Sequence, residues 1–195
     1  MAIRDLLWAC PACGTPDALA PAGRVEACCH CQATVRRGQG ATIVVQRPGA
    51  PAETRPAWEW CDRLPAFTRT VLGGRVLLRE AHAARPLRDG HELLGFVERF
   101  GPARPGRLEL GGDTLTFAPD TGEPPIVWPL LDITAVQPAS SALQLKLRGQ
   151  PVVSLKFLDS SVRLWEQGLH QALRAAYRAA GRGEIIEFQP RVSVR

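Results

Sequence analysis

The amino-acid sequence predicts a mostly β protein with one α-helix near its C-terminus. Two pairs of closely spaced cysteines near the N-terminus indicate a small metal-stabilised unit. Apolar and polar residues alternate through much of 91–157, which is typical of antiparallel strands with one buried and one wet face. An amphipathic helical stripe follows in 159–181. Together these patterns predict a small cysteine-rich unit followed by a curved antiparallel sheet capped by a helix.

The composition sets limits on size and location. The chain has 195 residues, of which 45% are hydrophobic, enough for one ordinary core or for a core plus a small satellite. No segment approaches the run of about 20 apolar residues that crosses a bilayer, and the N-terminus lacks the pattern of a secretory signal. Five of the six cysteines fall between residues 10 and 31, as in a metal site of a reducing compartment. We therefore expect a cytoplasmic protein.

The cysteines of residues 1–46 form two matching half-sites, Cys10-Pro-Ala-Cys13-Gly and Cys28-Cys29-His30-Cys31. A Cys-x-x-Cys turn lets two thiolates converge on one ion, and a glycine after the second cysteine permits the positive φ that closes the turn. Two such turns supply four soft ligands in a tetrahedron. We predict a Zn2+ site formed by Cys10, Cys13, Cys28 and Cys31.

Cys29 and His30 leave an alternative open. Cys29 and Cys31 are separated by one residue, which makes convergence on one ion harder, and His30 is the direct neighbour of Cys31. We expect both to lie outside the ligand set, with replacement of one thiolate by His30 as the alternative. Four thiolates leave no position for water or substrate, so the predicted metal is structural.

The stretches "LLWACPACG" and "VEACCHCQATV" resemble the zinc ribbon family over about residues 5–45. The resemblance implies that the zinc is structural. A segment this short buries little surface, so metal binding would supply folding free energy on the order of 10 kcal/mol. "ATIVVQ", residues 41–46, is expected to add a strand, and Trp8 to cover the metal site.

The next segments are less regular. Residues 47–57 are rich in Pro, Gly and Ala, and we predict a stiff, extended linker there. Residues 58–90 are an uncertain connecting segment in which "RVLLREAHAA" fits either a strand or a short helix, after a turn at Gly73-Gly74. Its aromatic residues either form an exposed docking face or, more commonly, pack against a neighbouring unit.

Residues 91–181 carry the clearest pattern. "ELLGFVERF" predicts a strand, and "GRLELGGDTLTFAP" predicts a hairpin that turns at Gly111-Gly112-Asp113. "PIVWPLLDITAVQP", "ALQLKLRG" and "PVVSLKFLD" predict further strands. The helix of 159–181 has Asp159 or Ser160 to cap its start and Gly181 to end it.

This order of elements, with "WPLLDITAV" as its most distinctive piece, resembles GRAM or pleckstrin-homology (PH)-like domains. The resemblance implies a binding module for membrane lipids or protein ligands, and no enzyme. Basic residues in the loop after the first strand would be the lipid contacts, which here are Arg99, Arg104 and Arg107. Three arginines can hold a phosphate by forked hydrogen bonds, and the alternative is a solvated loop.

The tail of residues 182–195 contains the apolar residues Ile185, Ile186 and Phe188. An extended apolar terminus either folds back on its own domain or adds to a partner's sheet edge or groove. We predict a partner-docking tail as the alternative to back-folding.

These features favour a non-enzymatic adaptor or scaffold that binds a protein partner through the ribbon and the PH/GRAM-like domain. The sequence contains no phosphate-binding glycine loop, nucleophile elbow or His-Glu-x-x-His pattern. One alternative is a peripheral membrane protein that binds anionic lipid through the arginine loop. Another is a nucleic-acid-binding ribbon, disfavoured because residues 1–40 carry four arginines against three acidic residues.

Overall fold

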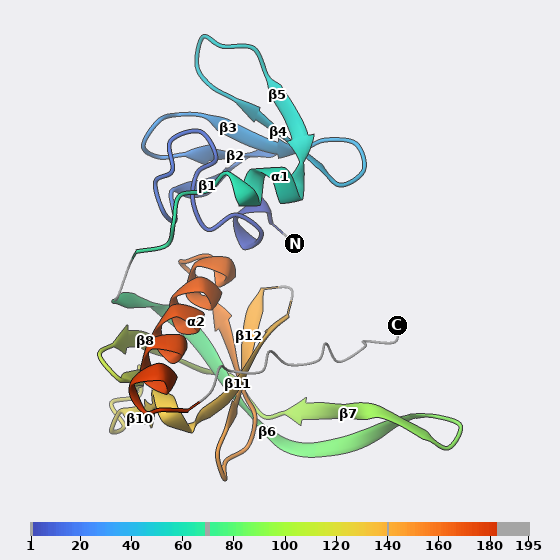
Figure 1. Cartoon of the computed structure of the whole chain (residues 1–195), viewed down its shortest axis with the longest axis vertical. Helices are drawn as coiled ribbons and strands as arrows, with labels where there is room; N and C mark the ends of the chain where they lie inside the picture. Colours follow the sequence, from blue (N-terminus) through green and yellow to red (C-terminus); the bar gives the residue numbers. More distant parts are fainter. Residues whose placement is uncertain (1, 69–70, 140, 183–195) are drawn as a thin grey trace. The chain divides into compact units, whose positions relative to one another are not determined.

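The computed structural model describes residues 2–68, 71–139 and 141–182. The described chain is mostly β, with two antiparallel sheets and one long helix near the C-terminus, which confirms the predicted fold class (Figure 1). It divides into two compact units. One comprises Met1–Thr68 with Ser160–Gln167, and the other Arg69–Asp159 with the chain from Gly168 onward.

The first unit is built on a five-stranded antiparallel sheet in which every strand pairs with the next along the chain. Two short helices accompany it, η1 (Ile3–Asp5) and α1 (Ala57–Asp62). The strands are β1 (Leu19–Ala22), β2 (Val25–Cys28), β3 (Thr34–Arg37), β4 (Thr42–Gln46) and β5 (Glu53–Pro56).

Two polar side chains join the helices of the first unit to its sheet. Glu26 in β2 is buried and accepts hydrogen bonds from the backbone N–H groups of Ile3 and Arg4 at 2.7 and 2.8 Å. Trp60 in α1 is buried and donates its indole N–H to the carbonyl of Ile43 at 3.1 Å. Both ends of this unit are therefore fixed to the same sheet.

The predicted linker of residues 47–57 is wrong in its second half. Glu53–Pro56 pairs with β4 as an edge strand, with Arg55 opposite Ile43. An edge strand tolerates proline because one row of its N–H groups needs no partner. The change from the first unit to the second falls after Thr68 instead.

The second unit contains an antiparallel sheet in the order β10-β9-β8-β6-β13-β12-β11, with β7 paired to β6. The first strand of this unit in the sequence, β6, and the last, β13, are therefore neighbours in the middle of the sheet. The helical elements are η2 (Leu130–Asp132) and α2 (Val162–Ala179). The strands are β6 (Leu72–Asp89), β7 (Glu92–Phe100), β8 (Arg104–Gly111), β9 (Thr114–Pro119), β10 (Ile126–Pro129), β11 (Ile133–Ala139), β12 (Ala142–Leu147) and β13 (Val153–Phe157).

The strand β6 corrects the prediction that the second domain begins at residue 91. Its first half pairs with β8 and β13, and its second half forms a long hairpin with β7 that runs out from the sheet (Figure 1). Gly73 and Gly74, predicted as a turn, lie inside this strand opposite Glu109 and Leu108. The alternation that marks β6 as a strand stops after Leu78, so the sequence pattern did not reveal its full length.

The predicted hairpin and helix are both confirmed. In the β8–β9 hairpin, Gly111 pairs with Thr114, while Leu108 and Phe117 face each other in the core. The second half of α2 runs alongside the sheet, and the hydroxyl of Tyr177 donates to the carbonyl of Ile133 at 3.0 Å (Figure 1). Among the described helices, none combines the length and the apolar character needed to traverse a bilayer.

Candidate metal centre

The first half-site is a tight turn that begins at Cys10. The backbone N–H of Cys10 donates to the carbonyl of Thr15 at 2.9 Å, and the N–H of Gly14 donates back to the carbonyl of Cys10 at 2.8 Å. Gly14 has a φ of +73°, so the glycine provides the left-handed backbone predicted for the closure of this turn.

The second half-site repeats this arrangement. The N–H of Cys28 donates to the carbonyl of Ala33 at 2.8 Å, and the N–H of Gln32 donates to the carbonyl of Cys28 at 3.0 Å. Gln32 has a φ of +61° and occupies the position that Gly14 has in the first turn. The structural role of Gln32 was missed from the sequence, although its place directly after the second cysteine was the available signal.

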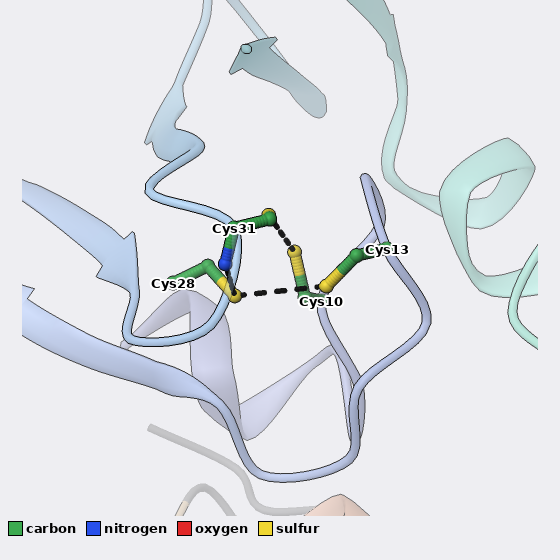
Figure 2. A group of neighbouring side chains, drawn as sticks. All are labelled: Cys10, Cys13, Cys28 and Cys31. Carbon is green, nitrogen blue, oxygen red and sulfur yellow. Dashed lines mark hydrogen bonds between the residues drawn. The ribbon is translucent and has the colours of Figure 1, made fainter. Parts of the chain in front are cut away.

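The sulfurs of Cys10, Cys13, Cys28 and Cys31 all lie within 4.8 Å of one another (Figure 2). The Sγ atoms of Cys10 and Cys31 are 3.7 Å apart, as are those of Cys13 and Cys28. An ion with tetrahedral metal–sulfur bonds of about 2.3 Å places its sulfurs about 3.8 Å apart. A disulfide would bring two sulfurs to about 2.05 Å, so these are separate thiols with the spacing of metal ligands.

Backbone amides support one sulfur in each half-site. The N–H of Ala12 donates to Cys10 Sγ at 3.4 Å, and the N–H of Cys31 donates to Cys28 Sγ at 3.5 Å. Such donors stabilise negative charge on sulfur without competing for the metal. The two turns are therefore shaped to hold thiolates.

Each half-site combines one buried and one outer cysteine. Cys10 and Cys28 are fully buried and pack in the apolar core of the first unit, which includes Leu7 and Val35. Cys13 is exposed and Cys31 is half-buried. The inner thiols thus connect the metal centre directly to the core, so the centre and the sheet are expected to form together.

The protonation of the thiols differs strongly within the cluster. Burial raises the pKa of Cys10 far above its usual range, and burial also raises the pKa of Cys31. Burial acts in the same direction on Cys13, but hydrogen bonds with Thr15 and His30 outweigh it and lower the pKa of Cys13 to about 6. Four thiolates so close together need a cation to balance their charge, so the donor set fits a metal ion.

Cys29 and His30 lie outside the group of four converging sulfurs. Both are exposed, and the backbone N–H of Cys29 donates to the carbonyl of Ala18 at 2.9 Å. The side chain of His30 interacts with Cys13 through a hydrogen bond. Thr15, whose Oγ1 lies 3.2 Å from Cys13 Sγ, is a second neighbour of the site that sequence reasoning missed.

The three arginines predicted to contact lipid lie in two strands, and the two in β8 lie on opposite faces. Arg99 lies in β7, whereas Arg104 and Arg107 lie three residues apart in β8 and therefore on opposite faces of that strand. Arg104 pairs with Glu123 at 2.7 Å and lies over the ring of the buried Phe117. Arg107 pairs with Glu109 at 3.5 Å, so the two residues of β8 cannot grip one phosphate together.

The tryptophans of the first unit differ in burial. Trp8 is buried and packs edge-to-face on Phe67 with ring centroids 5.3 Å apart. Trp60 is buried as well, whereas Trp58 is 64% exposed.

The predicted docking residues Ile185, Ile186 and Phe188 lie outside the described part of the chain.

No protein-family model matches the chain, and no curated protein matches its sequence. Four free thiols with tetrahedral spacing, supported by backbone amides and set into an apolar core, form a site that fits a metal ion.

Proposed function

We propose that the protein is a non-enzymatic adaptor or scaffold. In this proposal the first unit is a zinc ribbon whose Cys10, Cys13, Cys28 and Cys31 hold a structural zinc ion. The second unit is a PH/GRAM-like domain that binds a protein partner.

The sulfur geometry is the observation that carries the zinc-ribbon part of this proposal. Thiolates are soft donors that favour zinc in a tetrahedral site, and the 3.7 Å separations match that arrangement. Four protein ligands fill the coordination sphere of zinc and leave no position for a substrate or an activated water. A metal held in this way stabilises a surface and performs no chemistry.

The topology of the second unit supports the PH/GRAM-like assignment. β8, β9 and β10 pair in succession on one side of β6, while β13, β12 and β11 pair in succession on its other side, and a single long helix follows β13. An antiparallel sheet followed by one long helix agrees with what the resemblance implies. A fold of this kind offers strand edges and loops for ligands, which agrees with a binding role.

Metal analysis of the purified full chain tests the zinc ribbon. We expect one zinc ion per chain, lost in Cys28→Ser and retained in the matched control Cys29→Ser. Replacement of zinc by Co2+ should give the intense visible bands of a tetrahedral thiolate site. A cobalt spectrum that responds to added anions would reveal an exchangeable ligand and would replace the structural role with a catalytic one.

Affinity purification tests the adaptor role. The full chain should retain a partner whose binding is reproduced with two purified proteins, and Cys28→Ser should weaken it. A chain shortened after Arg182 tests whether Ile185, Ile186 and Phe188 contribute to docking. If no purified protein binds the intact chain while zinc is present, the adaptor role fails and the zinc ribbon still stands.

A further inference from the structure

The β6–β7 hairpin of the second unit ends in a strand whose outer edge has no partner strand among the described residues. β7 pairs only with β6, and the hairpin runs out from the sheet (Figure 1). The other neighbours of β6, which are β8 and β13, pair with it only as far as Leu78 and Glu80. The outer part of the hairpin is therefore a two-stranded ribbon.

This ribbon has no apolar core of its own. None of the side chains of β6 from Arg79 to Asp89 is buried. Leu93 and Val97 of β7 are 48% and 37% exposed. A two-stranded hairpin alone is at best marginally stable in water, and three or more strands with a hydrophobic face are needed for independent stability. A further strand along the ribbon would therefore stabilise it.

Every other open edge of the two described sheets contains a proline. The edge strands β1, β5, β10 and β11 each have one, namely Pro21, Pro56, Pro129 and Pro138. On the ribbon itself, β6 contains Pro86. Proline cannot donate to a strand ladder, and proteins place it on sheet edges to prevent pairing with other chains. β7 contains neither proline nor lysine, so its edge is the one in the described chain that lacks this protection.

The charge of the ribbon favours a protein strand as the partner of this edge. Residues 81–100 carry three arginines and three acidic residues, so their formal charges cancel. Nucleic acids and anionic membranes are bound by an excess of positive charge, which the ribbon does not offer. Two copies of a ribbon without net charge also do not repel each other.

We propose that β7 pairs with β7 of a second copy of this chain. Each copy presents the same open edge, so an antiparallel pair related by a two-fold axis fills both edges at once. The two ribbons then form one four-stranded sheet. This self-association goes beyond the adaptor proposed above and uses neither its metal centre nor its protein partner, so the two proposals can fail separately.

The regular part of β7 indicates the register of this pair. The β6–β7 ladder is irregular between Ala81 and Ala83 and again between Leu87 and Arg88. Between these two places β7 is regular over 95–99, and its central residue is Val97. A two-fold axis in an antiparallel ladder places one residue opposite itself, and at Val97 this axis pairs the whole regular stretch with its copy.

The charges of β7 agree with an axis at Val97. In that register no acidic residue of one copy lies opposite an acidic residue of the other. An axis two residues further toward the turn, at Gly95, would place Glu92 opposite Glu98 of the second copy. Directly opposed like charges destabilise a sheet, so the register centred on Val97 is favoured.

Sedimentation velocity of the full chain over a range of concentrations tests the proposal. We expect a monomer–dimer equilibrium. Val97→Glu should raise the dissociation constant about tenfold or more, because it places two carboxylates opposite each other across the axis. Within its own ribbon the new carboxylate lies opposite Arg85, so the hairpin should stay folded. The matched control Val127→Glu changes an exposed valine of the edge strand β10 and should leave the equilibrium unchanged.

A mixture of two variants gives a second readout that a folding defect would not produce. Val97→Lys alone should also weaken the dimer, whereas a mixture of V97K and V97E chains should restore it, because opposite charges then meet across the axis. The proposal is overturned if the intact chain stays monomeric at every concentration, which would leave the edge of β7 to a strand of a different protein. Equal dimerisation of V97E and V127E, or a mixture that does not associate, would overturn it as well.

Discussion

At the residue scale, the two cysteine turns differ at the position that follows the second cysteine. Gly14 and Gln32 both adopt positive φ, but only glycine does so without a steric penalty. The left-handed conformation costs a residue with a Cβ about 1–2 kcal/mol. The second half-site therefore contains strain that the first does not.

Gln32→Gly should stabilise the first unit by about 0.5–1 kcal/mol, since it removes this strain and loses only an exposed hydrogen bond to the carbonyl of Cys29. The matched change Gly14→Ala should destabilise the unit by about 1–2 kcal/mol. The added Cβ would also lie 3.3 Å from Pro65 Cγ. Thermal unfolding of the zinc-loaded chain measures both, and a destabilised Gln32→Gly variant would contradict the argument.

Thiol labelling should divide the six cysteines into three classes. Cys29 is exposed and should react first, whereas Cys61 is half-buried and should react slowly, because burial raises its pKa and so reduces its thiolate fraction. The four sulfurs of the metal centre should be protected until a chelator is added. Mass spectrometry of partly alkylated protein counts the classes, and simultaneous labelling of all six sites would rule out a bound metal.

The raised pKa of Cys61 also affects how the stability of the fold depends on pH. Because its folded pKa lies above the ordinary value of 9.0, the neutral thiol contributes its full stabilisation below about pH 9 and loses it as pH rises through the folded pKa. Cys61→Ala should therefore reduce the alkaline slope of the melting temperature without changing its slope near neutral pH. An unchanged alkaline slope would show that Cys61 does not ionise on unfolding.

At the scale of elements, residues that alternate strictly, such as those of the β8–β9 hairpin, could be predicted from the sequence together with their turn. The edge strand β5 and the long strand β6 could not. Pro56 obscured the strand pattern in β5, and the outer half of β6 has no buried face to impose alternation. The four cysteines were found from spacing alone, but Gln32 and Thr15 take part through backbone geometry and neighbouring polar contacts that spacing does not encode.

The pairing of β8 with β9 depends on the absence of a side chain at Gly106. A Cβ there would lie 2.5 Å from the carbonyl oxygen of Ala118 and 2.5 Å from the ring of Phe117. We expect Gly106→Ala to destabilise the second unit by about 1–3 kcal/mol. The control Gly73→Ala points into open space and should be neutral or stabilising by up to about 1 kcal/mol. Equal effects in urea unfolding would refute this packing argument.

At the scale of the whole molecule, the two units depend on different sources of stability. The second unit has a large apolar core shared by its strands and α2, whereas the first has a small core in which Cys10 and Cys28 are themselves members. Small domains with little buried surface commonly need a metal to fold. Loss of the metal should therefore affect one unit and spare the other.

Chelation should unfold the first unit while the second keeps its fold. We expect calorimetry to show two transitions in the zinc-loaded chain, of which only one disappears with a chelator and returns with added zinc. The second transition should stay within about 2–4 °C of its original temperature. Loss of both transitions would mean that the units fold as one.

Both lysines lie on the exposed face of the second sheet, in β12 and β13, and this placement decides where amine-reactive reagents can modify the protein. Acetylating enzymes, biotin esters and amine-coupled sensor chips that act on lysine would all attach to this side of the second sheet. Immobilisation through lysine would cover this face of the sheet, whereas coupling through the exposed Cys29 would leave it free.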